Sequence, residues 1–126
     1  MRMTWYTASV LISIKPINYE GGPIQVYENM YLIEAPSSRD AIEKAQELGR
    51  QEVALDDELS IDGIPAVRTF VGIRKIVSIS NPSPFDMDQT PPTNGTELTY
   101  ALYQLEDEAA LTRLAGGEEV YLLYLE

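Results

Sequence analysis

The sequence contains neither cysteine nor histidine. No disulfide, thiolate nucleophile, zinc–thiolate site or imidazole base can therefore form in it. Basic residues are scarce too: 9 Lys and Arg stand against 20 Asp and Glu, which gives a net charge of −11. Long apolar runs are also missing, since no stretch approaches the roughly 20 residues that cross a bilayer. These absences leave carboxylates as the main candidates for acid–base or metal chemistry.

In other respects the 126-residue chain has the composition of an ordinary globular protein. Apolar residues make up 44% and charged residues 23%, as in folded proteins rather than disordered ones. A chain of this length suits one domain and buries roughly two-thirds of the surface that it exposes when unfolded. We therefore expect a single domain over 1–126.

The acidic charge argues against direct nucleic-acid binding. Contacts to phosphates need clustered Lys and Arg, and Arg74-Lys75 is the only adjacent basic pair. The same charge would attract a basic protein, although it can also serve solubility alone. Residues 1–6 lack the shape of a signal peptide, because one basic residue is followed by no long apolar run. We expect a cytoplasmic protein without membrane contact.

Two strands are predicted at the start of the chain. Residues 4–15 alternate between apolar and small polar side chains for most of their length, which is typical of a half-buried strand. Pro16 ends this strand, and Gly21-Gly22-Pro23 reverses the chain into a second strand at about 24–34. The pair is predicted to be an antiparallel hairpin. The second strand is apolar on both faces, with Ile24, Val26, Met30 and Leu32 on one and Tyr27, Tyr31 and Ile33 on the other.

A helical period follows the second strand. The stretch 36–40 supplies a serine that can cap a helix and places Asp40 in the first turn. An apolar stripe continues from there, and its small residues favour close packing on a sheet. Gly49 is one candidate for the end of the helix, and continuation through Val53 is the other. The stripe consists of Ala41, Ile42, Ala45 and Leu48.

The middle of the chain predicts a second hairpin. Asp62-Gly63 is a tight-turn signal between 59–61 and a long β-branched run over 67–79. Gly72 inside that run indicates either a bulge or a close approach of the backbone to a neighbour. The segment 81–96 holds four of the eight prolines and is predicted to be an exposed loop or an extended arm.

The end of the chain predicts a strand over 98–105, a short helix from 106 and a last strand over 120–125. Gly116-Gly117 ends the helix, and its acidic start suits the helix dipole. The predicted class is α+β: one domain with a mostly antiparallel sheet of five or six strands, one long helix and one short helix. The expected order is strand, strand, helix, strand, strand, loop, strand, helix, strand.

The last two predicted strands are apolar on both faces. A small sheet with helices on one side has a single dry face, so something must cover the other. Three covers fit the pattern: packing within the chain, including the 81–96 segment, a second copy of the chain, or a foreign ligand in a groove. Tyrosine suits all three, because its ring buries while its hydroxyl stays in water. The candidate interface residues are Tyr100, Tyr103, Tyr121 and Leu123.

Several short motifs occur in a recognisable order: Trp5-Tyr6, Ile33-Glu34-Ala35, Leu48-Gly49, Phe70-Val71-Gly72-Ile73 and 117–121. In this order the chain resembles a family of short bacterial proteins that carries only a domain-of-unknown-function label. The resemblance covers most of 5–125 and departs at 81–96, where family members have a shorter connection. It implies a bacterial cytosolic α+β domain, and it implies no activity, substrate or catalytic residue.

Two groups of carboxylates are the candidates for catalysis or metal binding. Asp56-Asp57-Glu58 is the densest, but a magnesium or calcium site needs several such groups to converge, and a solvated acidic turn after a helix is the favoured interpretation. Asp86, Asp88 and Thr90 match the Asp-x-Asp-x-Thr string of aspartyl-phosphate phosphotransferases. That string needs a buried strand before it, which the prolines of 81–84 preclude. We predict no catalytic residue, no metal ligand and no cofactor.

Three functions follow from these observations. The first is a non-enzymatic binding or scaffold module that forms a homo-oligomer, most simply a homodimer. The alternative is an acidic inhibitor, such as an immunity-type protein, that binds a basic protein partner. A carboxylate-dependent metal enzyme that uses Asp56 and Asp57, or Asp86 and Asp88, is the third.

Overall fold

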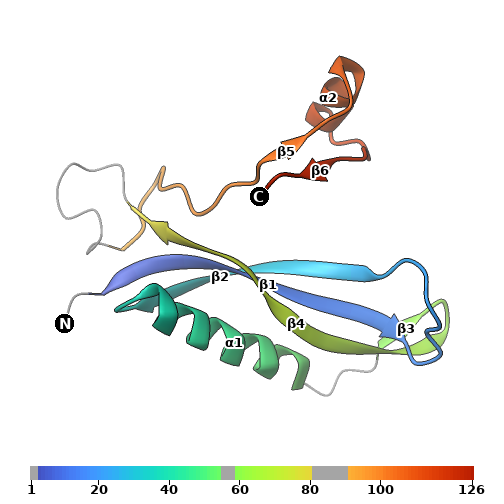
Figure 1. Cartoon of the computed structure of the whole chain (residues 1–126), viewed down its shortest axis with the longest axis horizontal. Coiled ribbons are helices and arrows are strands. Elements are labelled where there is room, and N and C mark those ends of the chain that lie inside the picture. The colour runs from blue at the N-terminus through green and yellow to red at the C-terminus, as the bar shows by residue number, and fades with distance from the viewer. Residues whose placement is uncertain (1–2, 55–58, 81–90) are drawn as a thin grey trace.

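This computed structural model describes residues 3–54, 59–80 and 91–126, in which it has six strands and two helices (Figure 1). The α+β class and the expected order of strands and helices are confirmed. The six strands divide between two antiparallel sheets, a larger one in the order β2-β1-β4-β3 and a smaller one of β5 and β6. The elements are β1 (Thr4–Pro16), β2 (Gln25–Ala35), α1 (Ser38–Ala54), β3 (Leu59–Ile61), β4 (Ile64–Ile79), β5 (Tyr103–Gln104), α2 (Glu108–Ala115) and β6 (Leu123–Tyr124).

The larger sheet is built around β1. This strand pairs with β2 along its whole length in one unbroken register, and with β4 on its other side. Asp62 and Gly63 join β3 to β4 with φ angles of 51° and 81°. Two consecutive positive φ angles are what a tight type I′ hairpin turn requires, so the predicted Asp-Gly turn is confirmed.

Strand β4 is irregular near Gly72. Its register against β1 shifts between Ser9 and Val10 and again between Leu11 and Ile12, so Gly72 lies between two irregularities. A Cβ atom built on Gly72 would meet nothing within 4 Å. The predicted bulge is therefore confirmed, and the alternative of a close backbone approach is wrong.

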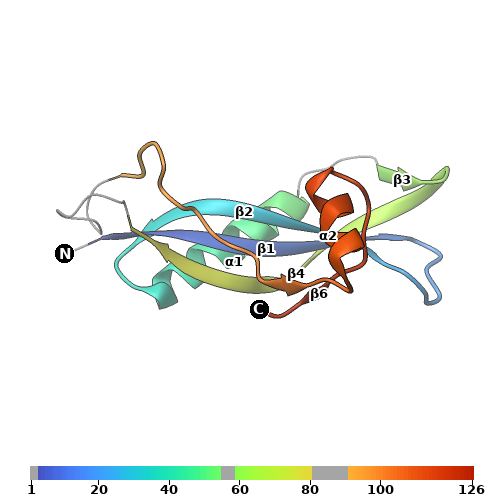
Figure 2. The same cartoon turned by 90° about the horizontal axis from the view of Figure 1, so that it is seen from above.

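Helix α1 covers one face of the larger sheet (Figures 1 and 2). It begins after Ser37, whose Oγ accepts the N–H of Asp40 at 3.2 Å, as the serine cap predicted. It passes Gly49 without interruption and ends at Ala54, so the longer of the two predicted helices is observed. Gly49 is buried against Phe70 of β4, and a Cβ at this position would lie 2.5 Å from the Phe70 ring. The missing side chain lets the helix lie close to the sheet.

The core lies between α1 and this face of the sheet. Alanines on both elements shorten the distance between helix and sheet, so the core is thin. Ile12 and Val10 of β1 are the largest apolar side chains that are fully buried. The cluster consists of Tyr6, Ala8, Val10, Ile12, Ile33, Ala35, Ala41 and Ala45, with Tyr31, Leu48, Val53, Phe70, Ile73 and Ile76 packed against it.

The opposite face of β1 is also buried, although no helix lies on it directly. Thr7, Ser9 and Ser13 are all buried there. The register places Ser9 between Met30 of β2 and Lys75 of β4, and these longer side chains flank the short hydroxyl. The expectation of a half-buried first strand is therefore wrong. A short polar side chain on a central strand is covered by its long neighbours.

The C-terminal unit, which we define as residues 91–126, lies on the side of the sheet opposite α1 (Figure 1). It contains β5, α2 and β6. Asp107 caps α2 by accepting the N–H of Ala110 at 2.9 Å. Of the predicted proline-rich segment 81–96, residues 81–90 lie outside the described residues. The remainder forms a turn in which the Thr96 N–H donates to the Thr93 carbonyl at 3.1 Å.

Candidate functional site

All four predicted interface residues lie in the C-terminal unit. Tyr121 is the most open of them, with 97% of its surface exposed. Leu123 and Tyr100 are also exposed, whereas Tyr103 is half-buried and packs edge-to-face on Tyr124 with ring centres 5.8 Å apart. The β5–β6 ladder, extended by a hydrogen bond from Leu125 to Leu102, brings these strands together. The C-terminal unit thus contains all four predicted residues, and three of them, Tyr100, Tyr121 and Leu123, are exposed.

The C-terminal unit is held to the sheet by the adjacent basic pair of β4. The Arg74 guanidinium donates to the Glu126 carbonyl at 2.6 Å and lies 4.4 Å from the Tyr124 ring centre. The Lys75 ammonium donates to the Tyr100 carbonyl and lies 3.5 Å from the centre of the same tyrosine's ring. These are cation–π and charge-assisted contacts with little apolar burial behind them.

Replacing both Arg74 and Lys75 with glutamine is expected to loosen the C-terminal unit from β4. Glutamine keeps hydrogen-bonding capacity but removes both cations from the aromatic rings. Amide hydrogen exchange in 100–104 and 121–126 should rise several-fold, while α1 keeps its protection. Lys15→Gln is the matched control, because Lys15 makes its ring contact with Tyr19 instead. Unchanged exchange in both segments would show that other contacts hold the unit.

The hydroxyl of Tyr100 links the two residues of the C-terminal unit that Lys75 and Arg74 bind, Tyr100 itself and Glu126. It donates to Glu126 Oε1 at 2.5 Å, and this hydrogen bond is the largest cause that raises the pKa of Tyr100 above its ordinary 10.0. Only the protonated phenol can donate, so this contact is present below pH 10 and is lost as the pH rises through the raised value. In an alkaline absorbance titration, Tyr100→Phe should remove a late-ionising phenol. Loss of an early-ionising phenol would contradict this assignment.

Charge is distributed unevenly between the C-terminal unit and β4. The C-terminal unit carries seven acidic residues and Arg113 as its one basic residue, which gives −6. Strand β4 carries Arg68, Arg74 and Lys75 and no acidic residue. The contact between the two therefore joins surfaces of opposite charge. The acidic residues are Glu97, Glu106, Asp107, Glu108, Glu118, Glu119 and Glu126.

A second exposed apolar surface lies on β2, which is an edge strand of the larger sheet. Val26, Met30 and Leu32 are exposed on the face that points away from α1. Tyr27 is exposed as well, on the face that α1 covers further along. The predicted assignment of these residues to two faces is confirmed by the pairing with β1.

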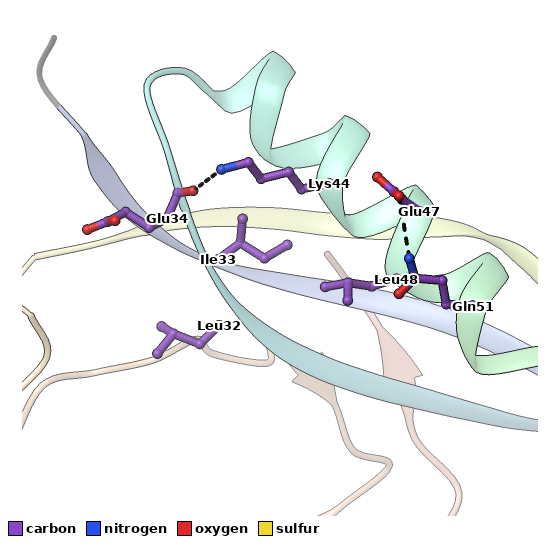
Figure 3. A pocket seen from close by; sticks show the side chains of 7 residues that line it. All are labelled: Leu32, Ile33, Glu34, Lys44, Glu47, Leu48 and Gln51. Atoms are coloured by element: carbon purple, nitrogen blue, oxygen red, sulfur yellow. Dashed lines mark hydrogen bonds between the residues drawn. The ribbon is translucent and has the colours of Figure 1, made fainter.

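A pocket of about 400 Å³ opens beside the β2 edge, between β2 and α1 (Figure 3). Leu32, Ile33 and Leu48 supply its apolar lining, and the other four lining residues are polar or charged. Lys44 donates from its Nζ to the Glu34 carbonyl at 2.6 Å and so fixes one end of the pocket. Its volume lies near the lower end of the range for ligand pockets. The lining is Leu32, Ile33, Glu34, Lys44, Glu47, Leu48 and Gln51.

A polar cluster ties the end of α1 to β4 on the same face of the sheet. Arg68 lies 3.6 Å from the Glu52 carboxylate and donates to the Glu52 carbonyl at 3.1 Å. Burial is the largest cause that raises the pKa of Tyr31, and the neighbouring Glu52 carboxylate raises it further. Because Arg68 and Glu52 bind each other, this cluster serves to anchor the helix end.

Nothing in the described residues supports metal chemistry. Over 3–54, 59–80 and 91–126 no three acidic side chains come together in a way that could hold a metal ion. The predicted candidates Asp56, Asp57 and Glu58, and likewise Asp86 and Asp88, lie outside the described residues. Neither helix of the described chain is long and apolar enough to cross a membrane.

Comparisons with known proteins add no function. No family model, curated protein or solved structure matches the chain.

The sequence prediction of the interface missed β2. Tyr27, Met30 and Leu32 were assigned to faces but not to an interface, although a strand that is apolar on both faces was the available signal. Arg74-Lys75 was noted only as too little basic charge for nucleic acid. Its contact with the C-terminal unit depends on chain segments about 25 and 50 residues apart, which local pattern cannot reveal.

Proposed function

We propose that this chain is a non-enzymatic binding module that forms a homo-oligomer. The supporting observation is the C-terminal unit, in which Ala110 is the single buried apolar side chain among residues 91–126. A two-stranded sheet such as β5–β6 is marginal in water unless it packs against something. Large exposed apolar patches mark interaction sites, and Tyr100, Tyr121, Leu123 and Leu125 are all exposed here. A partner on this unit would cover the exposed tyrosines and leucines.

A second copy of the chain is the first partner that we propose for this protein, whichever of its exposed surfaces that copy uses. Each copy carries two exposed apolar surfaces, on the C-terminal unit and on β2. The basic residues of β4 already bind groups of the same chain, so the exposed apolar surfaces are what a second copy would cover. In this proposal the protein is bacterial and cytoplasmic and uses no cofactor.

The test is copurification of two differently tagged copies expressed together. Purification through one tag should recover both in comparable amounts at 150 mM salt. A carrier protein with the second tag serves as the control for tag-mediated recovery. Recovery of the first copy alone would contradict self-association.

The acidic inhibitor remains a second candidate, because the charge of −6 on the C-terminal unit accompanies exposed aromatic rings. Aromatic anchors inside a charged rim are common in tight protein interfaces. A basic protein bound in this way should be captured from the source lysate at 50 mM salt and released at 500 mM. Equal retention at both concentrations would argue against this candidate.

A further inference from the structure

The two edges of the larger sheet differ in how far they are open to another strand. Edge strands in natural proteins are guarded by shortness, lysine, proline or bulges. At one edge, β3 has three residues and is guarded by its length. At the other edge, β2 has eleven residues, contains neither lysine nor proline, and pairs with β1 without a bulge. No described strand pairs with its free side. The β2 edge is therefore unguarded.

The β2 edge carries little charge, and that charge is partly compensated. A chain of net charge −11 repels its own copies, so two copies approach most easily where charge is balanced. Glu28 lies 3.6 Å from Arg74 and forms an ion pair with it. Lys44 binds the backbone carbonyl of Glu34 at 2.6 Å, which places a cation beside this end of the strand. These two glutamates are the only charged residues of β2. The C-terminal unit, at −6, is a far less favourable place for two copies to meet head-on.

We propose that two copies join through β2, antiparallel, about a twofold axis that passes through Met30 perpendicular to the sheet. The two four-stranded sheets would then form one sheet of eight strands, with both α1 helices on the same face. This inference rests on the proposed self-association and names its interface. The C-terminal units project from the opposite face and stay free for further contacts (Figure 1).

The position of the axis follows from the sequence of β2. A twofold axis perpendicular to the sheet places one residue opposite itself and pairs the others symmetrically around it. An axis at Glu28 would place Glu28 opposite itself, and an axis at Tyr31 would place Glu28 opposite Glu34. Like charges directly opposite are destabilising. An axis at Met30 pairs all eleven residues and puts each glutamate opposite an apolar side chain.

The same register fills the pocket beside the edge. With the axis at Met30, Tyr27 of the second copy lies opposite Ile33, which is a wall of the pocket between β2 and α1. Both residues point to the α1 side of the sheet. Tyr27 is 58% exposed in the single chain. Tyrosine is enriched at interfaces because it buries a large ring and keeps a wet hydroxyl. By symmetry, each copy covers the pocket of the other.

Single-cysteine variants test the register directly, because the chain has no cysteine of its own. Met30→Cys places two thiols directly opposite at the axis, within the Cα separation of about 4.4–6.8 Å that a disulfide needs. Under mild oxidation it should convert mostly to a covalent dimer. Leu32→Cys is the matched control, because its two copies would lie roughly 14 Å apart along the strands. Leu123→Cys reports contact between the C-terminal units instead.

Introducing a charge at Met30 supplies the second test. Met30 is 54% exposed, so lysine or glutamate there should leave the fold and its melting temperature nearly unchanged. Met30→Lys and Met30→Glu should each weaken self-association at least tenfold, because like charges then face each other at the axis. An equimolar mixture of the two variants should recover a heterodimer.

The outcomes separate this inference from the proposed function. If the unmodified chain is monomeric, the proposed self-association fails and the β2 interface fails with it. If the unmodified chain is dimeric but both Met30 charge variants remain dimeric, the β2 interface is wrong and self-association stands. Cross-linking of Leu123→Cys without cross-linking of Met30→Cys would also overturn it in favour of contact through the C-terminal units.

Discussion

Replacing Ile12 with alanine is expected to cost about 2–5 kcal/mol in the free energy of unfolding. Ile12 is 2% exposed and lies on the central strand under α1. Four of the eight residues in the core cluster are alanines, so the few large side chains carry most of the apolar burial. A domain of ordinary stability holds only about 5–15 kcal/mol, and this loss would leave it close to unfolding at 37 °C.

Urea unfolding followed by tryptophan fluorescence measures this loss, because Trp5 is the single tryptophan and lies in β1. Val67→Ala is the matched control. It removes an exposed β-branched side chain from β4, and its effect should stay within about 0.5 kcal/mol. A loss below about 1 kcal/mol for Ile12→Ala would mean that the core does not centre on β1.

Gly49→Ala is expected to destabilise the fold by about 1–3 kcal/mol, opposite in sign to the usual effect in a helix. Alanine normally stabilises the middle of a helix relative to glycine by roughly 0.5–1 kcal/mol. Here the new Cβ would lie 2.5 and 2.6 Å from two ring carbons of Phe70 and 3.0 Å from a Val10 methyl group. Helix and sheet would have to move apart to make room.

Gly72→Ala provides the control for this steric argument, since a Cβ there meets nothing within 4 Å. It should leave the unfolding midpoint unchanged or raise it slightly. Phe70→Leu introduced together with Gly49→Ala should recover part of the loss, because the smaller side chain leaves space beside the helix. A stabilising Gly49→Ala would show that α1 lies farther from the sheet than described.

Local pattern predicted the elements of this fold well, for identifiable physical reasons. The alternation in β1 and β2, the serine cap of α1 and the Asp62-Gly63 turn each depend on residues within one turn or a few positions of each other. Gly49 does not end α1. It lies inside the helix, where the close approach of the Phe70 ring leaves no room for a side chain. That role depends on tertiary packing, so the sequence could not decide between Gly49 and Val53 as the end of the helix.

The arrangement of the elements was less predictable. Burial of Ser9 depends on Met30 and Lys75, which pairing brings from distant parts of the chain. The division of the strands into two sheets depends on where β4 ends and the C-terminal unit begins, and composition carries no signal of that geometry. The apolar character of the last strands was evident, but its exposure could be established only once their position was known.

The candidate site, too, was predicted only in part from the sequence. Tyr100, Tyr121 and Leu123 were predicted from two-sided apolar strands, and the structure places all three, exposed, in the C-terminal unit. The β2 edge was not predicted, because an edge strand is defined by its place in the sheet. Only the strand order shows that β2 and the short β3 form the two edges of the sheet, and that β2 is the long, open one.

The measurement that tests self-association most directly is the mass of the unmodified chain in solution. Light scattering coupled to size exclusion, at tens of micromolar protein in 150 mM salt, needs no tag or variant. The proposed homo-oligomer predicts a mass of at least twice the 14.1 kDa of one chain, falling toward that value on dilution. A mass of 14.1 kDa at every concentration would contradict it.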